Sequence, residues 1–190
     1  MQLLVYASRT PVAEASYDLA VLTLRRGSCS STSSRQDVVR VLAEHSLQPH
    51  LLTIEVTENV ALEDSSAVIS TLHQLKASRV GIAVDDFGAG YSPLAQLSNI
   101  RPNLLKIDRS FISGLPDADS SLSVVRALVA LAAGFDMSVT AEGIETVEQA
   151  NILELLGCRR GQGFYCARPM SGEALIDYLE TSSLEVGSAA

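Results

Sequence analysis

The sequence predicts a parallel α/β fold, because short apolar strands alternate with amphipathic helices along most of the chain. Five segments are short, apolar and rich in β-branched residues, and a helical pattern follows each of them. Strands that are apolar on both faces need helices to cover both faces. A closed barrel and an open, doubly wound sheet fit this pattern equally well. The predicted strands are 51–56, 80–84, 104–107, 137–141 and 162–166, with one further candidate at 19–24.

The helices are predicted from apolar residues at three- and four-residue spacing and from residues that cap helix ends. Segment 120–133 carries one apolar face, and Gly134 ends it. Thr146 and Gln149 form a capping box that opens a helix closed by Gly157. The other predicted helices are 37–45, one capped by Asp64 and bearing Val68, Leu72 and Leu75, a short one at 93–97, and one capped by Ser171.

Composition excludes several classes of protein. With 190 residues, 47% of them hydrophobic, the chain is long enough for one domain with a core. No apolar run approaches the ~20 residues of a membrane-spanning helix. The formal net charge of −8 argues against a binder of nucleic-acid polymers, which needs a basic face. The three Cys have no C-x-x-C spacing, so we expect neither a zinc site nor disulfides, and the predicted location is the cytoplasm.

Polar and mostly ionisable side chains stand at the carboxyl ends of the first four predicted strands, and Gln162 lies in the fifth. Parallel α/β folds build their sites at the carboxyl ends of the strands. Glu58, Asp108 or Glu145 alone would be explained as a helix cap or a solvated loop residue. Adjacent acids at 85 and 86 are costly unless a cation or a basic group lies close to them. Converging carboxylates suit Mg²⁺, Mn²⁺ or Ca²⁺. The residues are Glu55 and Glu58, Asp85 and Asp86, Lys106 and Asp108, Glu142 and Glu145, and Gln162.

Lys106 is an ammonium inside an otherwise apolar strand, so it must face a site or pair with an acid. One interpretation is a structural ion pair with Asp85 or Asp108. The other is a lysine that faces a phosphate or activates a water. The two roles are compatible.

Five motifs, in order, give the chain a specific resemblance to the EAL domain family over residues 37–170. They are Glu-Val-Thr-Glu at 55–58, Asp-Asp-Phe-Gly-Ala-Gly-Tyr-Ser at 85–92, Leu-Lys-Ile-Asp-Arg-Ser-Phe-Ile at 105–112, Ala-Glu-Gly-Ile-Glu-Thr at 141–146, and Gln-Gly-Phe at 162–164 with Pro169. The resemblance implies a modified (β/α)₈ barrel that hydrolyses the bacterial second messenger cyclic di-GMP to linear pGpG. It also implies Mg²⁺ or Mn²⁺ as cofactor and inhibition by Ca²⁺.

The resemblance also implies a role for each acid. Metal would be held by Glu55, Asp85 and Asp86, with Asp108 associated with the metal site. Lys106 would lie near the attacking water, and Glu142 would be the general base. The remaining implied roles are substrate binding by Gln162 and support of the loop after the paired aspartates by Glu58 and Glu145. Segment 86–91 belongs to the region through which such domains pair, so we expect a homo-oligomer or a partner domain.

The front of the chain departs from the family. Neither the Glu-Ala-Leu signature nor the Asn of the following strand is found there, so we expect an incomplete barrel of five to six βα units. We divide the chain into 1–36, divergent or out of frame, 37–180, a partial EAL domain, and 181–190, a flexible tail. If residues 25–32 are written in GC-rich codons and the codons are read one frame over, they give a peptide that resembles the family. The simpler alternative is that this Ser-rich segment is a linker.

Two functions remain open. The first is a truncated cyclic di-GMP signalling domain of the phosphodiesterase lineage, weak or inactive because two metal ligands are missing. The second is a non-catalytic module that binds cyclic di-GMP or a protein.

Overall fold

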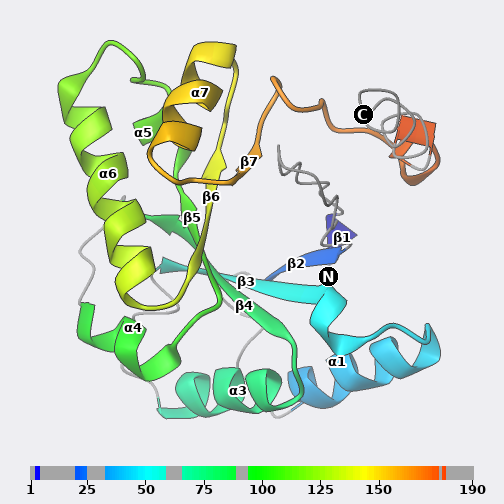
Figure 1. Cartoon of the computed structure of the whole chain (residues 1–190). Coiled ribbons are helices and arrows are strands. Elements are labelled where there is room, and N and C mark those ends of the chain that lie inside the picture. Colours follow the sequence, from blue (N-terminus) through cyan, green and yellow to red (C-terminus); the bar gives the residue numbers. More distant parts are fainter. Residues whose placement is uncertain are drawn as a thin grey trace, which may run out of the picture.

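The computed structural model describes residues 3–4, 20–24, 33–58, 66–88, 94–175 and 177–178. They form one seven-stranded sheet with helices packed around it (Figure 1). Its strands are β1 (Leu3–Leu4), β2 (Ala20–Leu24), β3 (Leu52–Thr57), β4 (Gly81–Phe87), β5 (Leu104–Ile107), β6 (Ser138–Glu142) and β7 (Arg160–Gln162). The helices are α1 (Ser33–Glu44), the 3₁₀ turn η1 (Pro49–Leu51), α3 (Ser66–Ala77), α4 (Leu94–Ile100), α5 (Arg109–Ile112), α6 (Asp119–Gly134) and α7 (Val147–Leu155).

The order of the strands in the sheet follows their order in the chain, from β1 to β7. The pair β1–β2 is antiparallel, and each later pair is parallel. A doubly wound sheet would reverse its strand order at a switch point. The structure therefore selects the barrel-type alternative: six parallel strands of an incomplete (β/α)₈ fold, including the candidate strand at 19–24.

The core lies between the sheet and the helices on its outer side. Ile54, Ile82 and Leu105 from three neighbouring strands are fully buried. From α3, the predicted apolar face packs inward, because Val68, Leu72 and Leu75 are all buried. The apolar face of α6 is confirmed in the same way by Val125, Leu128 and Ala132. Full burial of each such side chain contributes roughly 1.5–3 kcal/mol.

Two predicted strands have wrong boundaries. The last strand covers Arg160–Gln162 instead of 162–166, because Gly163 turns the chain at φ +155° and Cys166 N donates to Gly163 O. Strand β4 runs on to Phe87, and its register with β5 shifts between Val84 and Phe87.

Two of the predicted N-terminal helix caps are confirmed, at Thr146 and at Ser171. The Thr146–Gln149 capping box is present at the start of α7. Ser171 Oγ accepts from Ala174 N at 3.2 Å, at the start of a last helix over 172–175 and 177–178. The predicted cap Asp64 lies outside the described residues. No helix among the described residues combines the length and the apolar character needed to cross a bilayer.

Candidate functional site

Lys106 joins three strands through three carboxylates. Its Nζ lies 2.6 Å from Glu55 Oε1 on β3, 2.8 Å from Asp85 Oδ1 on β4 and 2.5 Å from Glu142 Oε1 on β6. Lys106 stands on β5, between β4 and β6. Four consecutive strands therefore deliver one ionisable side chain each to a single cluster.

The strand register explains why these side chains meet. Glu55 is paired with Ala83, and Asp85 lies two residues further along the same face of β4. Lys106 is paired with Thr140, and Glu142 stands two residues beyond Thr140. Each acid thus projects near the carboxyl end of a strand, and the parallel arrangement brings those ends to one rim.

Burial makes the charges of this cluster interdependent. Lys106 is 4% exposed and Glu55 is 3% exposed. Burial opposes the charge of Lys106, but Glu142, Glu55 and Asp85 outweigh it and hold the pKa of Lys106 above its ordinary value. Three acids face one ammonium, so when all are ionised the cluster carries an excess of negative charge.

The pKa of Glu142 is shifted toward neutrality. Burial, aided by the charges of Asp85 and Glu55, raises its pKa from 4.5 to about 7 against the opposing effect of Lys106. Gln162 Nε2 donates to the same Glu142 Oε1 at 2.8 Å, in the register that pairs these residues across β6 and β7. Glu142 is therefore suited to accept a proton at neutral pH.

Glu142→Gln should flatten the pH dependence of stability. A carboxyl whose pKa is raised by folding stabilises the protein fully below its unfolded pKa, and this contribution is lost as pH rises through the folded pKa. For Glu142 the window runs from 4.5 to about 7. The melting temperature of the wild-type chain should fall over that window more than the melting temperature of the Gln variant does. Parallel profiles would contradict this expectation.

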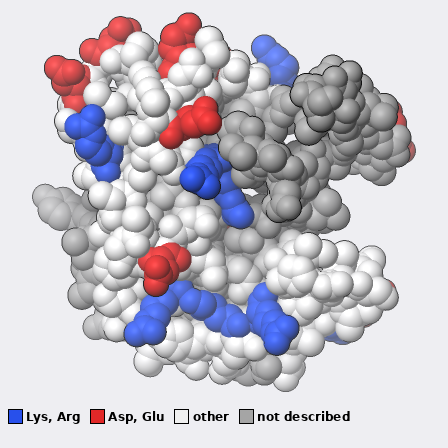
Figure 2. All heavy atoms as spheres, viewed as in Figure 1, with Lys and Arg blue, Asp and Glu red and all other residues white. Residues whose placement is uncertain are grey.

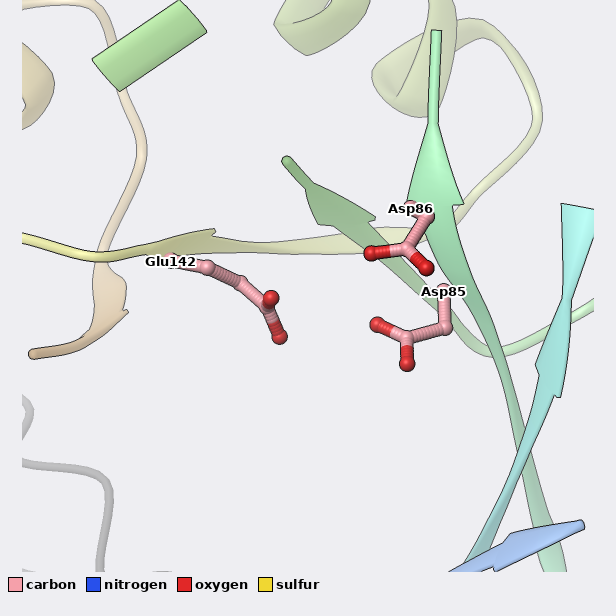
Figure 3. A group of neighbouring side chains, drawn as sticks. All are labelled: Asp85, Asp86 and Glu142. Atoms are coloured by element: carbon pink, nitrogen blue, oxygen red, sulfur yellow. The ribbon is translucent and has the colours of Figure 1, made fainter. Parts of the chain in front are cut away.

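The cluster also offers carboxylate oxygens that suit a hard divalent cation. One oxygen each from Asp85, Asp86 and Glu142 lies within 4.8 Å of the others, and the three side chains point toward a common space in Figure 3. Asp85 Oδ1 is buried, and the described part of the chain gives it no hydrogen-bond partner apart from the ion pair with Lys106 Nζ at 2.8 Å. An under-coordinated buried carboxylate oxygen among further carboxylates fits Mg²⁺, Mn²⁺ or Ca²⁺.

Asp86 has a strained backbone, with φ at +55° where β4 shifts its register. Its pKa is raised by burial and by Asp85 and Asp108, with which it shares a side-chain hydrogen bond. Asp108 caps α5 by accepting from Ser110 N at 2.9 Å. The pKa of Asp108 is lowered mainly by a hydrogen bond from the Ser110 side chain, and further by the backbone N–H groups of Ser110 and Arg109. Asp108 is thus a helix cap in contact with the acidic pair.

Glu58 and Glu145 have different surroundings. Glu58 is buried, and its Oε2 accepts from Gly88 N at 3.1 Å, at the start of the segment after the paired aspartates. Glu145 Oε1 instead accepts from Arg109 Nη2 at 2.6 Å. Arg109 was not singled out from the sequence, because its partner lies 36 residues away. The loop-supporting role assigned to both acids stays a prediction.

The tripeptide Glu-Ala-Leu does occur in the chain, at Glu173–Leu175. It lies in the last helix, where Glu173 and Ala174 are exposed, and not at the front of the chain, where the signature is expected. The tripeptide alone is therefore no guide to the site.

A model of one protein family matches most of this chain. The model of the EAL domain matches residues 16–169. The match begins further toward the N-terminus than the five motifs do, and it includes β2.

Several of the similar proteins are named for cyclic di-GMP. A bifunctional diguanylate cyclase/cyclic di-GMP phosphodiesterase of Pseudomonas aeruginosa, MucR, is 45% identical over 141 residues, which are 74% of this chain and 21% of MucR. The solved PaMucR phosphodiesterase in complex with c-di-GMP superposes with a TM-score of 0.78 at 40% identity, over 82% of this chain and 63% of that one.

Klebsiella pneumoniae BlrP1 has been solved with cy-diGMP and either calcium or manganese. These structures superpose with a TM-score of 0.71 at 29% identity, over 76% of this chain and 37% of BlrP1. The chain spans about a fifth of the length of MucR.

Proposed function

The chain belongs to the EAL domain family, and we propose that it is a cyclic di-GMP domain of the phosphodiesterase lineage, whose reaction is hydrolysis of cyclic di-GMP to linear pGpG. One observation carries the proposal: Glu55, Asp85, Lys106 and Glu142 converge at one rim of the sheet. Two of the solved relatives, PaMucR and BlrP1, hold cyclic di-GMP, and BlrP1 holds it together with manganese or calcium.

A divalent cation, Mg²⁺ or Mn²⁺, would be held by Asp85, Asp86 and Glu55, with Asp108 beside Asp86. When bound, such a cation lowers the pKa of water and neutralises phosphate charge. The buried Asp85 Oδ1, to which the described residues give no hydrogen-bond partner apart from the ion pair with Lys106, supports this assignment.

The chain's own residues supply the remaining chemistry. Glu142, with a pKa near 7, accepts the proton of an attacking water at neutral pH. Gln162 donates to Glu142 and thereby orients its carboxylate, and it is the residue to which we assign substrate binding. Lys106 holds the three acids together and presents a positive charge to a phosphate. Glu58 supports the chain after Asp86 through Gly88.

We propose that turnover is slow or absent in the chain as given, because the signature Glu and the Asn have no counterpart at its front. A metal held by fewer ligands fixes both the water and the phosphate poorly. The alternative is a non-catalytic module that binds cyclic di-GMP or a protein. It is favoured by the same missing ligands, whereas the intact set of site residues at the carboxyl ends of β3 to β7 counts against it.

Four further proposals concern the context of the domain. Residues 37–180 form the partial EAL domain, 1–36 are a divergent or out-of-frame segment and 181–190 a tail. The chain pairs with a second copy or a partner domain through the region that includes 86–91, of which 89–91 lie outside the described residues. Ca²⁺ supports nucleotide binding but inhibits hydrolysis. The domain works in the bacterial cytoplasm.

Mn²⁺ binding and cyclic di-GMP turnover by the purified chain test the proposal. The wild-type chain should bind Mn²⁺ and form pGpG slowly or not at all, well below the ordinary enzyme rate of about 1 per second or more. Asp85→Asn should weaken Mn²⁺ binding on the order of a hundredfold, because the variant replaces a carboxylate ligand. Asp117→Asn, at an exposed turn residue, is the matched control and should change nothing.

Each outcome of this experiment decides one part of the proposal. Equal Mn²⁺ affinity in wild type and the Asp85 variant would remove Asp85 from the metal site. Turnover at an ordinary enzyme rate would show that the missing ligands are not essential.

A further inference from the structure

The connection between β6 and α7, residues 143–146, directly follows Glu142. Hydrogen bonds join its main chain to the end of β7, the neighbouring strand, and to the residues just after it. Ile144 N donates to Gln162 O at 3.1 Å, and Tyr165 N donates to Ile144 O at 3.0 Å. Both of these hydrogen bonds join backbone atoms.

A side chain of α7 also holds this connection through hydrogen bonds. Gln149 is buried, and its Oε1 accepts from Glu145 N at 2.8 Å and from Thr146 N at 3.2 Å. Gln149 Nε2 also donates to Ile112 O at 3.2 Å, at the end of α5. The connection is thereby tied to the short helix that follows β5.

Arg109 contacts the connection at two residues, Gly143 and Glu145. Its stem lies flat on Gly143, because a β-carbon at Gly143 would stand 2.8 Å from both Arg109 Cβ and Cδ. Gly143 has φ +71°, a conformation that residues with a side chain rarely adopt. The guanidinium of Arg109 then reaches Glu145 at 2.6 Å. The two contacts lie one and three residues after Glu142.

We propose that Arg109 is a positioning residue that fixes Glu142 toward Lys106 by holding Gly143 and Glu145; the inference rests on the proposed function of the cluster. Arg109 follows Lys106 by three residues on the β5–α5 unit, so one short segment carries both the ammonium and the support for its partner. The side chains of Arg109 and Glu145 are 63% and 45% exposed, and an exposed ion pair alone contributes little. Packing of the stem on Gly143 is therefore the larger part of the effect.

Mn²⁺ titration of the full chain, followed by the paramagnetic resonance of free Mn²⁺, tests the proposal. Arg109→Ala should weaken Mn²⁺ binding about three- to tenfold, at or below the low end of what supporting residues of metal sites contribute. Arg109→Lys should recover part of the affinity, because lysine keeps a long stem and a positive charge. Arg40→Ala, which removes the exposed Arg40–Glu44 pair on α1, is the matched control and should leave Mn²⁺ affinity unchanged.

A second background separates positioning from general stability. In Glu142→Gln, Arg109→Ala should have no further effect on Mn²⁺ affinity, because Arg109 acts through Glu142, whose carboxylate oxygen lies within 4.8 Å of oxygens of the metal ligands Asp85 and Asp86. An equal loss in both backgrounds, or no loss in a wild-type chain that binds Mn²⁺, would overturn the proposal.

A chain that binds no Mn²⁺ would refute the proposed metal site without deciding the role of Arg109. In that case the ¹³C resonance of the Glu142 carboxylate decides it, since this resonance reports the contact with Lys106. Arg109→Ala should shift the resonance and Arg40→Ala should not. An unmoved resonance would overturn the positioning role.

Discussion

Lys106→Met should destabilise the fold by about 3–5 kcal/mol, because it leaves three carboxylates together in a buried site without their ammonium. Glu55, Asp85 and Glu142 all lie within 2.8 Å of Lys106 Nζ in the wild-type protein. Urea unfolding at neutral pH measures the loss. Mn²⁺ should raise the melting temperature of the variant more than that of the wild type, because the cation replaces the missing charge.

The only other lysine provides the control. Lys76, near the end of α3, donates to Arg101 O and is half-buried. Lys76→Met should cost about 1 kcal/mol, the contribution of one hydrogen bond. A Lys106 variant no less stable than the Lys76 variant would mean that the ion cluster does not organise the rim.

Gly163→Ala should destabilise the fold by about 3 kcal/mol or more, because the position has neither room nor a suitable backbone conformation for a side chain. A β-carbon there would overlap the backbone of Ile144, whose carbonyl carbon would lie at 2.8 Å. The backbone has φ +155°. The variant must also move Gln162 away from Glu142, so its affinity for Mn²⁺ should fall together with its stability.

Gly134→Ala is the matched control. Gly134 is the last residue of α6, and a β-carbon there meets nothing within 4 Å. Alanine at this position should be neutral or stabilising by about 0.5–1 kcal/mol. Urea unfolding of the two alanine variants side by side gives the comparison. Equal stability of the two would contradict the close approach between β7 and the connection after β6.

The parts of the fold that depend on local sequence could be predicted well. The capping box at Thr146 and Gln149 and the strand at 104–107 are present as expected, because caps and apolar runs act within a few residues. The end of β7 could not be predicted in this way. Phe164 and Tyr165 have the composition of a strand, but the tight packing of Gly163 on Ile144 turns the chain. That contact joins residues far apart in the sequence.

The candidate site was predictable in its residues but not in its contacts. Acids at successive strand ends indicated a rim, since parallel strands bring those ends together. The sequence left open whether Lys106 pairs with Asp85 or Asp108; the strand order places it against Asp85, Glu55 and Glu142. The sequence did not indicate a role for Arg109, because no residue near it in the chain identifies Gly143 and Glu145 as its partners.

Calorimetric titration of the purified chain with cyclic di-GMP in Ca²⁺ tests the central claim most directly, because Ca²⁺ is expected to support binding without hydrolysis. We predict saturable binding with a Kd of about 10 μM or tighter, which corresponds to about −7 kcal/mol, and loss of that binding in Asp85→Asn but not in Asp117→Asn. A folded chain that shows no heat of binding, or binding that Asp85→Asn leaves unchanged, would contradict a cyclic di-GMP site at this rim of the sheet.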